Sequence, residues 1–136
     1  MSVIRHADSR RTQTPNGVMT TLASPGQGDA GLAVWRLEMP PGAVGPRHAF
    51  DTEQVWSVLD GGATIELGGE PVVLAAGDTV VLPADTFRQV FADPERGVTA
   101  IAAAPAGTLA YAPGVEVDPH CAAPAGGDKL APAWVV

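Results

Sequence analysis

Turn-forming residues interrupt the chain so often that long helices have little room. Sixteen glycines and thirteen prolines are spread through 136 residues. Short apolar segments lie between them at intervals of roughly 8–12 residues, a spacing typical of β-sandwiches and barrels. No window longer than about ten residues has a clear helical period. The sequence therefore predicts an all-β fold.

Alternation of apolar and polar side chains predicts where the strands lie. A turn at Asp60-Gly61-Gly62 is expected to end the central strand region, and Gly68-Gly69 to form a hairpin. The segments on either side of residues 83–86 are expected to pair with each other. Strands are predicted over residues 18–23, 31–39, 48–59, 63–67, 72–74, 79–82, 87–91 and 98–104.

Composition limits the partners and the cellular location. The net charge of −7 argues against nucleic acid and anionic membranes, which need a basic surface. No signal peptide is evident, and no apolar run reaches the roughly 20 residues that span a bilayer. One cysteine, Cys121, cannot form an internal disulfide, which favours the cytoplasm. The neighbouring His120 and Cys121 lack a third partner and are given no role.

The chain is expected to form one domain with two appendages. Residues 1–16 are a polar N-terminal arm, residues 17–112 form a barrel, and residues 113–136 form a tail. Trp134 in the apolar end of the tail is expected to dock on the barrel or across a dimer.

Two segments, 40–61 and 77–92, carry regularly spaced glycines and polar residues. In order, the spaced positions are Gly42, His48, Phe50, Gln54 and Gly61, then Gly77, Pro83, Asp85 and Arg88. This spacing resembles the two motifs of the cupin superfamily. The resemblance implies a cupin-type antiparallel β-barrel (a jelly roll) that binds a small molecule and forms a homodimer.

Most of the metal ligands of that family pattern are replaced. Cupin metals are usually held by two histidines and a glutamate of the first motif and a histidine of the second, and only His48 is unaltered. Phe50 has no lone pair, and Arg88 would repel a cation. We therefore predict no metal cofactor. If a divalent metal does bind, His48 and Gln54 would hold it, joined by Glu53 if a β-bulge turns that side chain inward.

Side chains of one parity are expected to face the barrel interior. His48 is predicted to move a proton, Arg88 to hold negative charge and Gln54 to orient a substrate oxygen. Arg88 has the alternative of an internal ion pair with Glu53 or Asp85. The predicted substrate-binding residues are Phe50, Trp56, Val58 and Val90, although Phe50 and Trp56 also suit an ordinary core.

Three functions remain open. The first is a small-molecule enzyme without a conventional metal, which isomerises, cyclises or otherwise moves a proton on an anionic or oxygenated organic substrate. The second is a metal-dependent dioxygenase with an unusual ligand set. The third is a barrel that binds a small molecule without catalysis.

Overall fold

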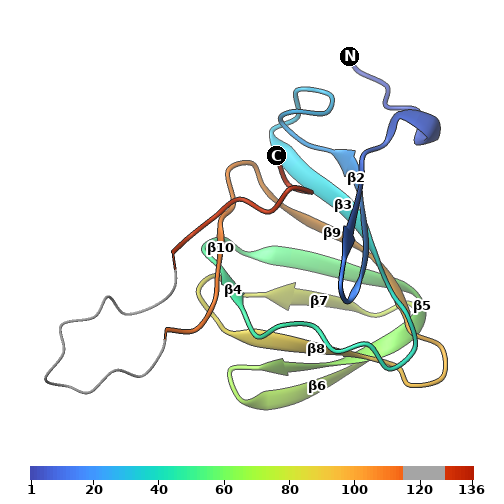
Figure 1. Ribbon diagram of the computed structural model, residues 1–136, viewed down its shortest axis with the longest axis vertical. Helices are drawn as coiled ribbons and strands as arrows, with labels where there is room; N and C mark the ends of the chain where they lie inside the picture. The colour runs from blue at the N-terminus through green and yellow to red at the C-terminus, as the bar shows by residue number, and fades with distance from the viewer. Residues whose placement is uncertain (115–127) are drawn as a thin grey trace, which may run out of the picture.

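The computed structural model describes residues 1–114 and 128–136, and the regular secondary structure of this part of the chain is almost entirely β-strand (Figure 1). A single 3₁₀ turn, η1 (His6–Asp8), precedes the strands. The strands are β1 (Arg11–Thr14), β2 (Gly17–Ala23), β3 (Leu32–Met39), β4 (Ala49–Phe50), β5 (Gln54–Leu67), β6 (Glu70–Ala75), β7 (Thr79–Leu82), β8 (Arg88–Ala92), β9 (Val98–Pro105) and β10 (Ala110–Tyr111). The prediction of an all-β fold is confirmed.

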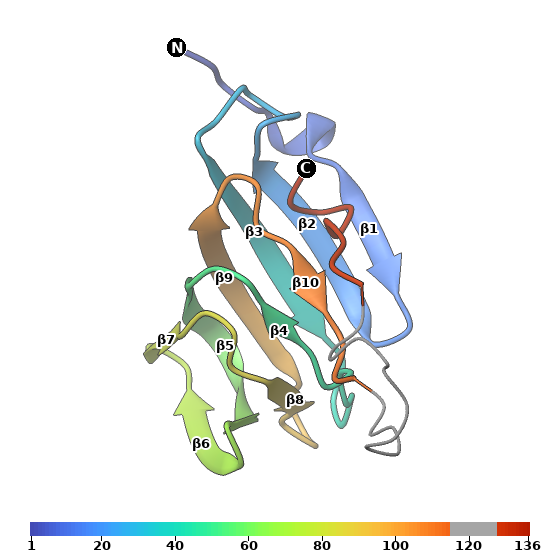
Figure 2. The same ribbon diagram turned by 90° about the vertical axis from the view of Figure 1, so that its left-hand side faces the viewer.

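One antiparallel sheet runs in the order β1-β2-β3-β9-β5-β6, and β7 and β8 also pair with β5. The two short strands β4 and β10 pair with each other, and Figure 2 shows them in front of the larger sheet. Alternation explains the layers: along β3 every second side chain, from Ala33 to Met39, is buried. The apolar faces of β3, β5 and β9 thus meet on the inside of a curled sheet.

Strand β5 is longer than predicted because the expected turn at residues 60–62 does not end it. The strand bulges between Val58 and Asp60 and continues to Leu67. Its first half pairs with β7 and β9, and its second half pairs with β6 and β8. Gly61 has φ 68°, and a Cβ there would lie 2.0 Å from the Gly97 carbonyl oxygen. The glycines therefore allow a bend within a strand, which the sequence pattern alone reads as a turn.

The two hairpin predictions have different outcomes. Gly68-Gly69 does connect β5 to β6 in a two-residue hairpin, with Leu67 opposite Glu70. The predicted pairing of β7 with β8 is wrong. Leu82 of β7 lies opposite Gln54, whereas Arg88 of β8 lies opposite Leu67 at the other end of β5. The intervening loop therefore carries the chain between the two halves of β5.

The barrel is closed by an extended segment that runs along β8. The amide of Gly45 donates to the Val90 carbonyl at 2.9 Å, and His48 and Arg88 exchange two backbone hydrogen bonds of 3.0 and 2.8 Å. This ladder fixes His48 directly beside Arg88 in the backbone, even though the two residues are 40 positions apart.

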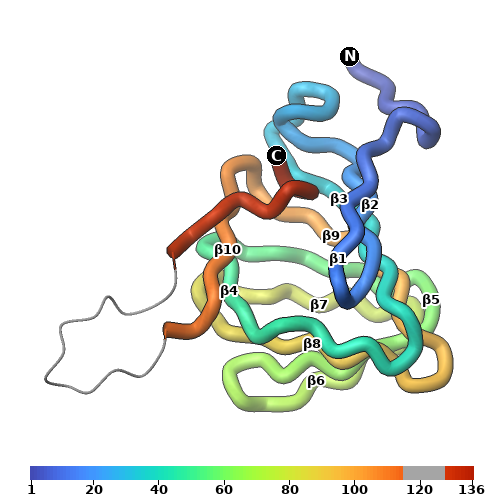
Figure 3. The backbone as a smooth tube through the Cα atoms, in the orientation of Figure 1, coloured from blue at the N-terminus to red at the C-terminus, as the bar shows by residue number. Residues whose placement is uncertain are grey.

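Both ends of the described chain pack on the barrel. The polar arm predicted for residues 1–16 contains β1, which pairs with β2 along its whole length. At the other end Trp134 packs against the core, and its carbonyl accepts a 2.9 Å hydrogen bond from the Thr21 hydroxyl. Figure 3 shows the C-terminal segment returning to the same end of the molecule as the start of the chain.

Nowhere in residues 1–114 or 128–136 does the chain form a helix with the length and hydrophobicity needed to cross a membrane.

Candidate functional site

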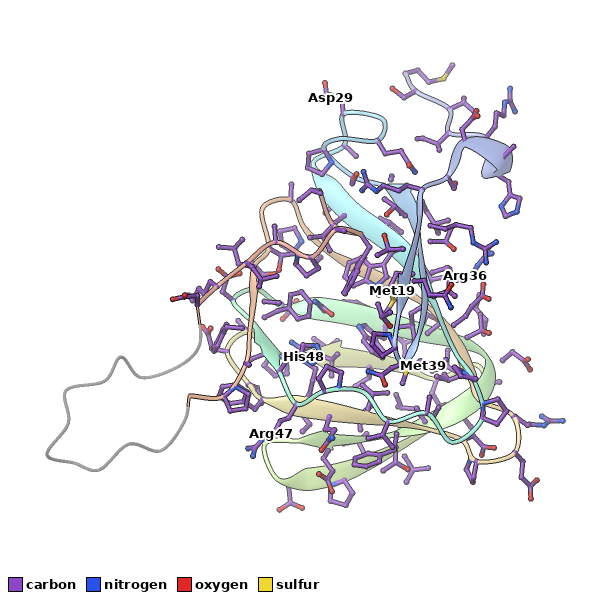
Figure 4. The ribbon with its side chains drawn as sticks, in the orientation of Figure 1. Met19, Asp29, Arg36, Met39, Arg47 and His48 are labelled. Carbon is purple, nitrogen blue, oxygen red and sulfur yellow. The ribbon has the colours of Figure 1, made fainter. Side chains whose placement is uncertain are left out.

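A cavity of about 780 Å³ opens inside the barrel. Its volume lies in the range of pockets that bind small organic molecules. Figure 4 shows Met19 and Met39 directed from β2 and β3 toward the interior, where His48 also lies. The walls are mostly apolar and come from Met19, Trp35, Leu37, Met39, Phe50, Trp56, Val90, Leu130, Pro132 and Trp134.

His48 is half-buried in the cavity wall with a defined tautomer. Its Nδ1 lies 2.8 Å from the Pro46 carbonyl oxygen. Because a carbonyl only accepts, Nδ1 must carry the hydrogen and donate it. Nε2 of the neutral ring is then left with its lone pair. The ring also packs edge-on against Phe50, with centroids 5.4 Å apart. The residue is therefore arranged as a proton acceptor.

The surroundings of His48 favour its neutral form. Burial lowers its pKa below the ordinary value of 6.5, and the positive charge of Arg88 lowers it further. The hydrogen bond to Pro46 raises the pKa, but by less than burial lowers it. An imidazole that stays neutral near pH 7 can accept a proton there.

This lowered pKa predicts a specific loss of stability in acid. The unfolded chain protonates His48 near pH 6.5, whereas the folded chain resists protonation until lower pH. The unfolded state therefore binds more protons in that window, and the free energy of unfolding falls as the pH drops through it. Urea titrations at about pH 7.5 and about pH 5.5 measure this effect. Between the two pH values, the free energy of unfolding should fall less in His48→Gln than in wild type. An equal loss in both proteins would contradict this assignment. His6→Gln, in the exposed turn η1, is the histidine control.

Gln54 offers an unused hydrogen-bond donor at the same cavity. Its side chain is 1% exposed and lines the cavity. The Trp56 indole N–H donates to Gln54 Oε1 at 3.0 Å. Since an indole N–H can only donate, the bond fixes the oxygen of the amide toward Trp56. Gln54 Nε2 is buried and has no hydrogen-bond partner among the described residues. It is thus an unsatisfied donor in a side chain that lines the cavity.

Arg88 is a buried cation in the interior of the barrel. It is 0% exposed, and its Nε, Nη1 and Nη2 have no hydrogen-bond partner among the described residues. The alternative of an ion pair with Glu53 or Asp85 is not formed: Glu53 is exposed, and Asp85 accepts a 2.7 Å hydrogen bond from Tyr111. Burial lowers the pKa of Arg88 to about 10, so the guanidinium stays charged at neutral pH. The Arg88 Cζ lies 5.2 Å from the centroid of the Phe50 ring.

The predicted site residues are only partly brought together. His48, Gln54, Phe50, Trp56 and Val90 line the cavity. Arg88 and Val58 are buried but do not line it.

Several lining residues were missed by the sequence analysis. Trp35, Leu37 and Met39 of β3 face the cavity, and their alternation along the strand was a usable signal. Tyr111 was given no place from its sequence, yet it lines the cavity on β10. His120 and Cys121 lie outside the described residues.

The donor set does not fit a metal ion. Phe50 and Arg88 have no lone pair to offer. Of the four family ligand positions, His48 Nε2 and the second lone pair of Gln54 Oε1, whose first accepts from Trp56, remain against the three or four protein ligands that such sites use. Within residues 1–114 and 128–136 no group of three His, Cys, Asp or Glu side chains gathers closely enough to hold a metal. We therefore derive no chemical step through a metal.

The closed β-barrel and its apolar cavity define a small-molecule-binding barrel protein. The family model for the cupin domain matches residues 35–101, which contain all four positions discussed above. This chain belongs to the cupin superfamily.

Solved structures with the same fold share little sequence identity with this chain. The polyketide cyclase RemF from Streptomyces resistomycificus is 17% identical, with a TM-score of 0.67 over 79% of this chain and 81% of that one. KdgF from Halomonas sp. is 22% identical, with a TM-score of 0.63 over 77% and 94%. A nucleoside dehydratase is 18% identical, with a TM-score of 0.64 over 77% and 82%. No curated protein matches the sequence.

Proposed function

We propose that this protein is a small-molecule enzyme that moves a proton on an apolar, oxygenated organic substrate without a metal. His48 is the base, and Gln54 is the hydrogen-bond donor to the substrate oxygen. The observation that carries the proposal is the pairing of one fixed acceptor with one fixed donor in an apolar cavity. His48 Nδ1 is held by Pro46, and Gln54 Oε1 is held by Trp56.

The proton transfer follows from these two side chains. His48 Nε2 takes a proton from a carbon next to a substrate carbonyl, and the C–H electron pair moves into the carbonyl group. The carbonyl oxygen becomes an enolate oxygen, to which Gln54 Nε2 donates. The resulting imidazolium then returns the proton at another position, which completes an isomerisation. Alternatively, the enolate carbon attacks a second carbonyl of the same substrate and the imidazolium protonates the resulting alkoxide oxygen, which completes a cyclisation. No redox partner is needed.

Arg88 contributes charge in this scheme without contacting the substrate. Its effect on the pKa of His48 indicates that its field reaches the base. Electrostatic stabilisation is strongest where charge develops in a site of low dielectric constant that excludes water. A permanent cation beside the cavity therefore stabilises the enolate more than the neutral ketone, which lowers the barrier to proton removal.

The proposed substrate is a ring compound or another bulky apolar molecule that carries a carbonyl group. Three tryptophans, Trp35, Trp56 and Trp134, line the cavity together with two methionines. Such walls favour large apolar surfaces, and the thioether of methionine adapts to their shape. Among the structural neighbours, one is named a polyketide cyclase and another a nucleoside dehydratase, and both kinds of reaction require a proton to be moved.

Deuterium exchange on 2-tetralone tests the proposal without knowledge of the natural substrate. This bicyclic ketone has exchangeable protons next to its carbonyl, and NMR in D₂O follows their loss. The protein should accelerate exchange well beyond the same concentration of free imidazole. Exchange no faster than with free imidazole would contradict the proposed catalysis. If the ketone binds but does not exchange, the barrel is a binding protein, which was the third function left open by the sequence.

The expected homodimer and the cytoplasmic location stay predictions, as does the absence of a cofactor.

A further inference from the structure

We infer that Phe50 shields Arg88 from the cavity and so makes the site selective for neutral ligands over anions. This inference rests on the proposed function, because it names the charge state of the substrate that the same cavity takes. It assigns Phe50 as a specificity-determining residue. The anionic substrate considered from the sequence is thereby set aside in favour of a neutral oxygenated one.

The guanidinium of Arg88 is isolated from polar partners. All three guanidinium nitrogen positions are buried without a hydrogen-bond partner among the described residues. Burying a charge without a partner costs several kcal/mol, so such a group is rarely retained by chance. The residue nevertheless does not line the cavity. A ligand in the cavity therefore lies near a cation that it does not touch.

Phe50 is the residue that lines the cavity and also contacts Arg88. Its ring is 3% exposed, forms part of the cavity wall and has the Arg88 Cζ 5.2 Å from its centroid. The backbone on both sides holds it in place. Phe50 lies opposite Ala110 in the β4–β10 pair, and its carbonyl accepts a 2.8 Å hydrogen bond from the Asp85 amide. The ring is thus a fixed partition rather than a loose side chain.

The partition affects anions and neutral ketones differently. A carboxylate entering the cavity loses its water and gains few partners, because the walls are mostly apolar and the buried guanidinium of Arg88 does not line them. A ketone carries no charge and so loses less on leaving water. Its oxygen acquires negative charge during the reaction, when the field of Arg88 acts through the ring. The other cation at the cavity, Arg47, is exposed and lies over the Phe87 ring at 5.6 Å.

Two probes of nearly equal size test the shield by calorimetry: 2-acetonaphthone, a neutral ketone, and 2-naphthoate, an anion. Wild type should bind the ketone at least about tenfold more tightly than the anion. Phe50→Ala should bind 2-naphthoate at least about tenfold more tightly than wild type, since a direct charge-assisted hydrogen bond to Arg88 becomes available. The double variant Phe50→Ala, Arg88→Met should lose this gain, which separates Arg88 from Arg47.

A second comparison covers the case in which Phe50→Ala does not fold. In the shielded protein, Arg88→Met should weaken binding of 2-naphthoate by no more than about tenfold, the same through-space effect that the enolate experiences, because the anion makes no direct hydrogen bond to the guanidinium. Equal binding of both probes by wild type, no binding of the ketone, or a loss of naphthoate affinity of about a hundredfold or more in Arg88→Met, which would report a direct hydrogen bond, would each overturn the inference. So would an anion gain that persists in the double variant.

The two experiments separate the two proposals. Exchange of 2-tetralone without discrimination between the naphthyl probes overturns the shield and leaves the proton transfer intact. Discrimination without exchange overturns the proton transfer and leaves the shield intact.

Discussion

Replacing His48 by glutamine is expected to reduce the rate of 2-tetralone exchange by at least about 10²-fold, the lower end of what a positioned general base contributes. Glutamine is uncharged and has no nitrogen that accepts a proton at neutral pH. It preserves a polar side chain at the half-buried position beside Phe50. NMR measures the exchange, and thermal unfolding monitors the fold.

The matched control for this variant is His6→Gln. His6 lies in the exposed turn η1, so its loss should leave the exchange rate within about twofold of wild type, a difference of a few tenths of a kcal/mol. A His48→Gln protein that is folded and exchanges 2-tetralone at the wild-type rate would remove His48 from the mechanism. Equal losses in both variants would indicate a non-specific effect of histidine removal.

Replacing Arg88 by methionine is expected to stabilise the fold while it weakens catalysis. The guanidinium is fully buried without a hydrogen-bond partner among the described residues. Its contact with the Phe50 ring is worth about 0.5–2 kcal/mol, less than the several kcal/mol needed to remove a charge from water. An apolar side chain of similar length should therefore raise the free energy of unfolding by about 1–4 kcal/mol.

The same variant should slow 2-tetralone exchange by about tenfold, because the developing enolate loses a nearby positive charge. Urea titration and the NMR exchange assay measure the two effects on one protein. Arg36→Met is the control. Arg36 is a half-exposed residue of β3 whose charge lies 3.9 Å from Glu38, so its loss should change stability by no more than about 0.5 kcal/mol. A strongly destabilised Arg88→Met protein would contradict the description of Arg88 as an unpaired buried charge.

Much of the fold could be predicted because its signals are local. Alternation placed β2, β3, β7 and β9 close to their observed bounds, and Gly68-Gly69 identified its hairpin. The errors arose where pairing is long-range. A glycine pair can end a strand or bend it, and the contact of Gly61 with the Gly97 carbonyl decides between these outcomes. Likewise, the partners of β7 and β8 depend on which half of β5 each strand reaches.

The candidate site was predictable to a similar degree. The motif spacing identified His48, Gln54 and Arg88 as candidates. The ladder between residues 44–48 and β8 places His48 beside Arg88. The spacing gave no information on what each polar atom would contact. The hydrogen bond from His48 to the Pro46 carbonyl, the bond from Trp56 to Gln54 and the placement of Phe50 against Arg88 all depend on side-chain geometry. These contacts decide the tautomer, the orientation of the amide and the access to the cation.

The central claim is that His48 is a neutral imidazole with a free Nε2 and no bound metal. The ¹⁵N chemical shifts of the histidine side chains in the purified protein test this directly, with the His48 signals identified by their absence from His48→Gln. We predict a protonated Nδ1 and an unprotonated, metal-free Nε2 at neutral pH. A ring protonated on Nε2, a doubly protonated imidazolium or a metal-shifted Nε2 signal would contradict the account.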